Sequence, residues 1–401
     1  MKSLMKREVF KINTNIAFII PYLTDGGAER VVATLSLNMP ENYNVYIITY
    51  QDKENKYPHK GTVININSSE SNNILGKIWN TIERIYKIKK IKKKYNIEKT
   101  MSFLDNPNII NILSRYKDKV VISIRNQKSK EIEAGKKKLQ KSIIKNLYNK
   151  ADKIVAISQG VQEDLIVNFK VNPKLISYIY NPVDINYINS LKCELIEDEY
   201  LDIFNEKTII TAGRLTYQKG QKHLIKAFNE VKKIIPDSNL VILGDGELRL
   251  ELEGLIKKYK LEDSVHLLGF KANLFKYINK SGVFVLSSMF EGFGNVITEA
   301  MASGTVVIST DCKSGPKEIL NPVNINMKSN DIIWGEYGII TPLFKDSNES
   351  DEIISIEEKK LADAIIKILN DNNLKQKYKN KINERIKNFD VNSIVKQWCD
   401  L

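Results

Sequence analysis

The chain has 401 residues, 42% of them hydrophobic and 27% charged, and carries a formal net charge of +13. Since one compact domain usually spans ~100–200 residues, the length predicts two domains and excludes a peptide, a fibre or a disordered tail. No run of ~18 apolar residues could cross a bilayer, and residues 1–10 lack the apolar stretch of a signal peptide. Three distant cysteines, Cys193, Cys312 and Cys399, show no metal-ligand spacing. We therefore expect a cytoplasmic protein.

The positive charge is concentrated in residues 76–150, where 18 Lys and 3 Arg face 6 acidic residues, a surplus of 15; the rest of the chain sums to −2. Two stretches of this segment, 76–96 and 136–150, have apolar residues at helical spacing. These positions are Ile78, Ile82, Ile85 and either Ile88 or Lys89, with Trp79 and Tyr86 nearby, and then Leu139, Ile143, Ile144 and Leu147. Such helices either cover a sheet with solvated lysines outside or present the lysines to an anionic lipid surface. A nucleic-acid partner is disfavoured, because neither a zinc-finger spacing nor an RNA-recognition aromatic signature occurs.

Short β-rich runs alternate with longer helical patterns from end to end, which is typical of parallel sheets covered by helices. The expected strands are residues 16–22, 45–50, 100–104, 120–124, 154–158 and 176–180, then 208–212, 240–243, 265–268, 283–287, 306–309 and 338–341. The predicted fold class is α/β, with two facing doubly wound, Rossmann-like parallel-sheet domains and a cleft between them.

A proline after the sixth strand and an irregular acidic stretch beyond it place the domain boundary. We expect an N-terminal domain over residues 1–183, a C-terminal domain over 184–380, and a helix over 381–401 that packs back toward the N-terminal domain.

In open α/β sheets, ligands bind beyond the carboxyl ends of the strands. After the first strand, Gly26 and Gly27 precede a helix, where a glycine pair forms either a tight turn or a phosphate site. The first strand of the C-terminal half ends before Arg214, and Lys219 follows five residues later. An Arg fork and a mobile Lys suit a diphosphate; the alternative is two surface cations near a turn, which their position at a strand's carboxyl end disfavours.

The most informative loop follows the strand over residues 283–287 and leads into a helix. It contains the Gly-x-Gly segment Gly292, Phe293, Gly294, then Asn295 and Val296. Its amides are placed to receive an anion, whereas Glu291 and Glu299 suit the hydroxyl groups of a sugar or ribose. The loop indicates a polyhydroxylated, phosphorylated ligand, unless the two acids are only a loop carboxylate and an ion-pair partner.

Several motifs together resemble glycosyltransferase family four, the retaining enzymes of GT-B type, over roughly residues 14–385. They are Gly-Gly-Ala-Glu-Arg, Gly-Arg-Leu-x₃-Lys-Gly, Gly-Asp-Gly-Glu, the Glu-x₇-Glu pair Glu291 and Glu299 within Glu-Gly-Phe-Gly-Asn, and Ser-Gly-Pro-Lys-Glu-Ile-Leu. The last two versions look like those of bacterial enzymes that build capsule, lipopolysaccharide or lipid-linked oligosaccharides.

The resemblance implies a nucleotide sugar donor, most often a UDP-sugar, bound by the C-terminal domain, and an acceptor bound by the N-terminal domain. Arg214 and Lys219 would hold the diphosphate and stabilise the charge on the leaving group; Glu291 would contact the transferred sugar and Glu299 the ribose. The implied donor-binding residues are Gly26, Gly27, Arg214, Lys219, Phe270, Gly292, Phe293, Gly294, Asn295, Val296 and Glu299. No Asp-x-Asp pair occurs, so we expect neither a metal ion nor a cofactor.

One departure concerns the histidine that many relatives carry in the first domain, since none of His59, His223 and His266 fits that place. We assign Asp105, Arg125 and Asn126, which follow expected strands, to sugar or acceptor contacts.

The resulting hypothesis is a cytoplasmic, retaining hexosyltransferase, peripheral to the inner face of the cell membrane. It would use an acceptor carried on undecaprenyl diphosphate, contact anionic lipid and bind no nucleic acid. The alternatives are a nucleotide-sugar epimerase of the same architecture and a non-catalytic partner subunit.

Overall fold

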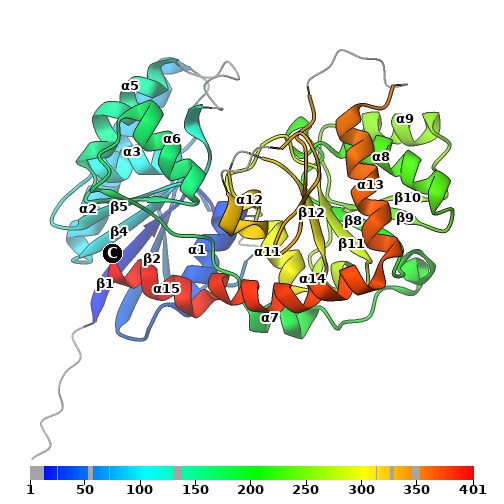
Figure 1. The fold of residues 1–401 in the computed structure, drawn as a ribbon. Coiled ribbons are helices and arrows are strands. Elements are labelled where there is room, and N and C mark those ends of the chain that lie inside the picture. Colours follow the sequence, from blue (N-terminus) through cyan, green and yellow to red (C-terminus); the bar gives the residue numbers. More distant parts are fainter. Residues whose placement is uncertain are drawn as a thin grey trace, which may run out of the picture. The chain divides into compact units, whose positions relative to one another are not determined.

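The computed structural model describes residues 13–24, 26–52, 57–71, 73–129, 138–312, 314–325, 329–345 and 353–401. These residues form two compact units (Figure 1). The N-terminal unit extends to Ile157, resumes at Gln162–Pro182 and takes in Val395–Leu401; the C-terminal unit holds Ser158–Val161 and Val183–Ile394. The chain thus passes into the C-terminal unit after Pro182, beside the boundary expected at residue 183.

In the described part of the N-terminal unit, seven parallel strands form a sheet in the order β3-β2-β1-β4-β5-β6-β7. The strands are β1 (Thr14–Ile19), β2 (Tyr43–Thr49), β3 (Thr62–Asn65), β4 (Lys99–Phe103), β5 (Lys119–Ile124), β6 (Lys153–Ala156) and β7 (Ile176–Tyr178). The α-helices are α1 (Gly27–Asn38), α2 (Ile74–Lys94), α3 (Asp105–Leu113), α5 (Lys138–Leu147) and α6 (Gln159–Phe169). The run from Ile16 to Ile20 is fully buried, as expected for a strand with helices on both faces of its sheet.

The described residues of the C-terminal unit form a second sheet of seven strands, in the order β10-β9-β8-β11-β12-β14-β13, parallel except for the antiparallel edge pair β13 and β14. Its strands are β8 (Thr208–Ala212), β9 (Asn239–Leu243), β10 (Val265–Gly269), β11 (Val283–Leu286), β12 (Val307–Thr310), β13 (Ile333–Trp334) and β14 (Ile339–Thr341). Its α-helices are α7 (Ile185–Leu191), α8 (Gln221–Ile234), α9 (Arg249–Lys258), α10 (Phe275–Asn279), α11 (Asn295–Ala302), α12 (Pro316–Leu320), α13 (Ile356–Asn370) and α14 (Asn372–Arg385). The last helix, α15 (Val391–Asp400), begins in this unit, and its residues from Val395 onward belong to the N-terminal unit.

The predicted fold class of two doubly wound parallel sheets is confirmed, and every run expected to be a strand contains one. The sequence missed β3 and β13. β3 is a four-residue edge strand whose first two residues are exposed, and β13 is a two-residue antiparallel edge. Neither has the apolar run that marked the other strands.

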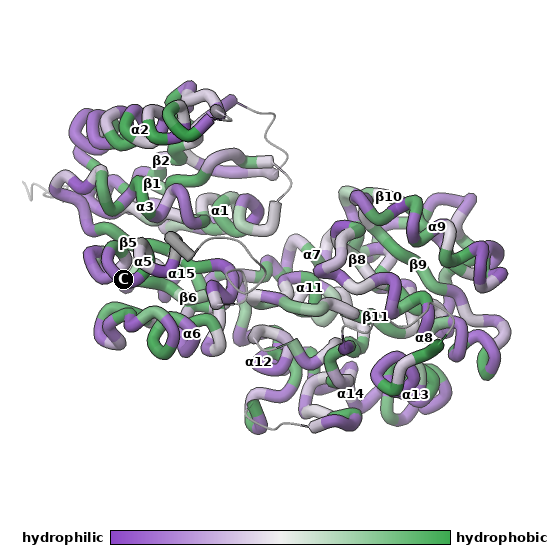
Figure 2. Tube along the Cα trace, turned by 90° about the horizontal axis from the view of Figure 1, so that it is seen from above, coloured by the Kyte–Doolittle hydropathy of each residue, from purple (hydrophilic) through white to green (hydrophobic). Residues whose placement is uncertain are grey.

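The basic helix α2 fits only in part the first of the two interpretations given above, in which its apolar stripe covers the sheet. Ile88 is fully buried in the core cluster, and Ile85 packs against this cluster, whereas Ile78 and Ile82 are 53% and 55% exposed. Figure 2 shows hydrophobic and hydrophilic residues alternating along this helix. Only the second half of the predicted stripe therefore faces the core. The other expected helix, over 136–150, lies partly outside the described residues.

None of the helices in the described ranges is both long enough and apolar enough to span a membrane.

Candidate functional site

The strongest candidate site lies at the carboxyl ends of β8 and β11. These strands are neighbours in the C-terminal sheet, so the loops that follow them emerge side by side. After β8 the chain forms a short 3-10 turn, Tyr217–Lys219, before α8. After β11 it forms the Gly-x-Gly loop that leads into α11. The sheet topology thus brings together two loops that are about 70 residues apart in the chain.

Lys219 and Glu291 meet between these two loops. The Nζ of Lys219 lies 2.6 Å from Oε1 of Glu291, and the two side chains are 19% and 9% exposed. The same carboxylate oxygen accepts a hydrogen bond of 2.7 Å from the Ser288 hydroxyl. A carboxylate with two donors in a mostly buried place has a well-defined position, which a ligand-binding group requires.

Backbone contacts hold the two loops against each other. The amide of Met289 donates to the carbonyl of Gln218 at 2.8 Å, and the Ser287 hydroxyl donates to the carbonyl of Lys219 at 2.9 Å. Gly220 has a left-handed φ of +61°, and a side chain there would collide with the carbonyl oxygen of Ser287. Glycine at this position therefore permits the approach that places Lys219 beside Glu291.

The amino terminus of α11 follows directly. Its N-cap residue is Gly294, with φ of +88° and no side chain to cap the helix, so the amides of Asn295 and Val296 begin the first turn. Unlike its neighbours, Phe293 has a side chain that is 1% exposed and packs edge-on against Phe389 at 5.8 Å between ring centroids. Phe293 thus has a core role, and only its backbone is left to face a ligand.

The other residues of the C-terminal unit that are predicted to bind the donor lie at separate places. Glu299 lies in the second turn of α11 and is 9% exposed. Arg214 follows β8 with an exposed side chain, and within the described chain it forms no ion pair with an acid; its carbonyl accepts from the Gln221 amide at 3.0 Å. Phe270 is 65% exposed after the edge strand β10. The structure therefore joins Lys219 to Glu291 but shows no such direct pairing for Arg214.

In the N-terminal unit, Gly26 caps α1 with extended backbone, as the glycine pair after β1 suggested. The carboxylate of Glu29 folds back over it, so that any side chain at Gly26 would collide with this carboxylate. An acid at a helix amino terminus satisfies the local dipole. A phosphate would therefore have to displace Glu29 before it could use the α1 amides.

Asp105 and Arg125 are engaged within the N-terminal unit. Asp105 pairs with Lys128 at 2.8 Å and accepts a hydrogen bond from the Tyr148 hydroxyl at 3.3 Å. Arg125 is 8% exposed and donates to the side chain of Asn181 at 2.7 Å. Its burial lowers the pKa of the guanidinium to about 10, although Glu29 opposes this shift.

Asn126 is the exposed member of the proposed acceptor set. Lys128, two residues further along the chain, is buried and forms the ion pair with Asp105. Asp105 and Arg125 are thus both held by other side chains of the unit, and Asn126 is the most exposed of the three residues.

Sequence reasoning missed Ser288, Ser314 and the returning carboxylate of Glu29. Ser314 donates to the backbone carbonyl of Glu291 at 2.7 Å and so ties the loop after β12 to the same site. No spacing rule distinguishes these residues from ordinary loop serines and helix acids, because their roles depend on which strand ends are adjacent.

Cys312 lies close to this site but has no reactive character. Its thiol is fully buried and donates to the carbonyl of Ser288 at 3.1 Å. Burial, reinforced by the charge of Glu291, raises the pKa of this thiol to about 12. The group therefore stays protonated and acts as a small core side chain.

Comparisons with known proteins cover both units. Residues 25–187 match the family model Glycosyltransferase Family 4, and residues 197–327 match Glycosyl transferases group 1. An uncharacterized glycosyltransferase of Methanocaldococcus jannaschii is 36% identical over 84% of this chain and 87% of its own length.

A second relative, the N-acetylgalactosamine-N,N'-diacetylbacillosaminyl-diphospho-undecaprenol 4-alpha-N-acetylgalactosaminyltransferase of Campylobacter jejuni, is 33% identical over 95% of this chain and 97% of its own. Among solved structures, Anabaena HepE in complex with UDP aligns with a TM-score of 0.73 over 96% of this chain and 99% of that one; at 20% identity this likeness concerns the fold. The chain therefore belongs to the glycosyltransferases of family 4.

Proposed function

We propose that this glycosyltransferase moves a sugar from a nucleotide diphosphate donor, a UDP-sugar, to a glycan carried on undecaprenyl diphosphate. The observation that carries the proposal is the Lys219 and Glu291 pair beside the uncapped amino terminus of α11. A cation and a row of amides suit the negatively charged diphosphate of such a donor, and an acid beside them suits its hydroxyl groups.

Each side chain then has a role. Lys219, aided by the exposed Arg214, stabilises the negative charge that grows on the departing nucleoside diphosphate. Glu291 accepts hydrogen bonds from the transferred sugar, and Glu299 does so from the ribose, with the first amides of α11 on the phosphate. Because the two cationic side chains supply the charge, we propose that the reaction needs no metal ion or other cofactor.

We also propose that the anomeric configuration is retained without a covalent bond to Glu291. Oε1 of this carboxylate is already held by Lys219 at 2.6 Å and Ser288 at 2.7 Å, which favours a hydrogen-bonding role over that of a nucleophile. The acceptor hydroxyl would then attack from the side that the leaving group vacates.

The acceptor proposal is supported by two Campylobacter jejuni relatives whose names specify undecaprenol-linked glycan acceptors. We infer a role in bacterial polysaccharide or oligosaccharide assembly, such as lipopolysaccharide or capsule, at the inner face of the cell membrane. Asn126, together with Asp105 and Arg125, is the proposed contact on the acceptor side.

The test is an incubation of the full chain with a panel of nucleotide sugars, with and without an undecaprenyl-diphosphate-linked saccharide. Release of nucleoside diphosphate together with a lengthened glycan, its new linkage having the donor's anomeric configuration by NMR, is the expected result. Conversion of the donor into an isomeric nucleotide sugar without acceptor would identify an epimerase instead, and inertness toward every donor would favour a non-catalytic subunit.

A further inference from the structure

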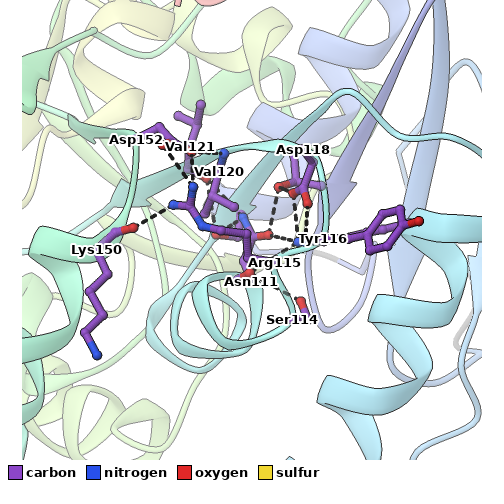
Figure 3. A network of polar contacts seen from close by, with 12 residues as sticks. Asn111, Ser114, Arg115, Tyr116, Asp118, Val120, Val121, Lys150 and Asp152 are labelled. Atoms are coloured by element: carbon purple, nitrogen blue, oxygen red, sulfur yellow. Dashed lines mark hydrogen bonds and ion pairs between the residues drawn. The ribbon is translucent and has the colours of Figure 1, made fainter.

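The helix α2 is firmly attached at its carboxyl-terminal half. Lys92 is fully buried, lies 2.9 Å from the carboxylate of Asp118 and donates to the Asn111 side chain at 2.8 Å. Asp118 also accepts from the hydroxyl of Thr100 at 2.6 Å. Figure 3 shows Asp118 and Asn111 within this polar network. Together with the buried Ile88, these contacts fix the orientation of α2 on its unit.

The amino-terminal half of the same helix leaves its apolar side chains in solvent. Six of them are more than half exposed, which is far from the usual fate of large apolar groups on a sheet-covering helix. They are Ile74 (76%), Leu75 (80%), Ile78 (53%), Trp79 (66%), Ile82 (55%) and Tyr86 (68%). We call these six residues the α2 stripe.

The α2 stripe occupies one side of the helix. At 100° per residue its members fall within an arc of about 140°. Of the buried residues of α2, Asn80 and Ile88 lie outside that arc, and Lys92 lies at its edge, about five turns beyond the first stripe residue. Lys89, Lys90 and Lys93, all exposed, continue along the stripe's side toward the carboxyl end. The solvent face of α2 therefore begins apolar and ends cationic.

The charge of α2 decides which occupant fits this face. The helix carries seven Lys and one Arg against the single acid Glu83. A second copy docked stripe to stripe would bring two such cationic helices together, whereas an anionic bilayer offers negative headgroups beside an apolar interior. Trp79 and Tyr86 have amphipathic rings of the kind that gather at the headgroup level.

We propose that the α2 stripe inserts into the headgroup boundary of an anionic bilayer while the lysines that follow it contact the lipid phosphates. The contact is thus partly hydrophobic, which goes beyond a purely electrostatic attraction of surface lysines. Its purpose rests on the proposed function, because a lipid-linked acceptor is met only at a membrane.

The binding test uses vesicles of phosphatidylcholine with 30% phosphatidylglycerol, and the full chain with Trp334→Phe. The other tryptophan, Trp398, is 1% exposed, so Trp79 then dominates the lipid-sensitive fluorescence. We expect a blue shift of Trp79 emission on vesicle addition and quenching by brominated lipid. Unchanged emission would overturn the proposal.

Variants distinguish binding through the α2 stripe from nonspecific binding by exposed apolar residues. Ile78→Ser with Ile82→Ser should weaken vesicle binding by about tenfold or more, since interfacial binding scales with buried apolar area. The matched control is Leu195→Ser with Leu250→Ser, two residues that are 86% and 81% exposed elsewhere; its binding should equal that of the wild type. All four positions are exposed, so thermal unfolding should be unaltered.

Lipid composition and salt complete the design. Lys89→Gln with Lys90→Gln and Lys93→Gln should remove the preference for anionic over neutral vesicles, and 0.5 M NaCl should weaken but not abolish wild-type binding. Equal binding of the wild type to neutral vesicles, or equal binding by the stripe variant, would contradict the proposal. If the wild type instead forms a dimer, the stripe variant is monomeric and neither binds vesicles, the α2 stripe is a dimer interface.

The failure of this inference is distinguishable from that of the proposed function. If the enzyme transfers sugar to a short, water-soluble acceptor analogue but the stripe variant binds vesicles as the wild type does, only the membrane contact is overturned. Vesicle binding as described, with no transfer from any donor, would overturn only the proposed function.

Discussion

Replacement of Lys219 by alanine tests the chemistry of the site most directly. The substitution removes the cation that lies 2.6 Å from Glu291 and leaves that 9% exposed carboxylate with the Ser288 hydroxyl as its remaining side-chain donor. A mostly buried acceptor that loses a charged partner costs about 1–3 kcal/mol of folding stability; we take this range over the larger losses known for fully buried pairs because Lys219 itself is 19% exposed.

The catalytic effect should exceed the effect on stability. If Lys219 stabilises the charge that develops on the leaving diphosphate, its loss should lower kcat by about 10²–10³-fold, as for other single donors aimed at a developing anion. KM for the donor should change much less, since the interaction strengthens in the transition state. Denaturant unfolding and steady-state kinetics on the same preparation measure the two effects separately.

The matched control is Lys222→Ala. Lys222 lies in the first turn of α8, is 36% exposed and pairs at 3.6 Å with Glu251 rather than with Glu291. This variant should keep wild-type kcat and change stability by less than about 1 kcal/mol. A Lys219→Ala enzyme with kcat within threefold of the wild type would refute the role assigned to Lys219, whatever its stability.

Three further outcomes are expected. Glu299→Gln should weaken binding of the nucleoside diphosphate, seen as a smaller ligand-induced rise in Tm, and an unchanged rise would contradict the ribose contact. Asp118→Asn should lower the unfolding free energy by about 3–5 kcal/mol, because Lys92 is left buried without its counter-charge; equal stability in urea would contradict this account. In native protein a thiol reagent should modify the exposed Cys193 first and reach the buried Cys312 only on unfolding.

The loss of folding stability at acidic pH should depend on the same buried pair, Lys92 and Asp118. Burial alone would raise the pKa of Asp118, but the charge of Lys92 and the hydrogen bonds to this carboxylate outweigh it, so the pKa lies below its ordinary value. A lowered carboxyl pKa contributes stability that is present above about pH 4 and is lost as the pH falls through the folded-state pKa. Wild-type unfolding free energy should therefore decline in this acidic range, and Asp118→Asn should flatten the decline. If the unfolding free energies of the two proteins fell equally as the pH is lowered, the stabilising role given to ionised Asp118 would be contradicted.

Strand positions were predictable because their signal is local. Each central strand is a short apolar run between polar turns, and burial on both faces of a parallel sheet requires such a run. β3 and β13 escaped prediction because edge strands are buried on fewer sides and can be short and polar. Their existence depends on the neighbour to which they pair, which no local window contains.

The candidate site was predictable as a set of loops but not as a geometry. The order of strands β8 and β11 in the sheet brings Lys219 to Glu291, although 72 residues separate them in the chain. The same dependence on neighbours applies to two acids of the N-terminal unit. Glu29 reads as an ordinary first-turn acid until its carboxylate is seen to fold over Gly26, and Asp105 reads as a free loop acid until Lys128 pairs with it.

The helix α2 shows why burial of a charge is the hardest feature to predict from a pattern. Lys92 sits among lysines that are exposed, such as Lys93 and Lys94, and nothing in that run distinguishes it. The difference comes from Asp118 and Asn111, which a different helix and loop supply. A buried ammonium without such partners would be prohibitively costly. The partners therefore select which lysine enters the unit, and the helix that they hold in place carries its apolar stripe outward into solvent.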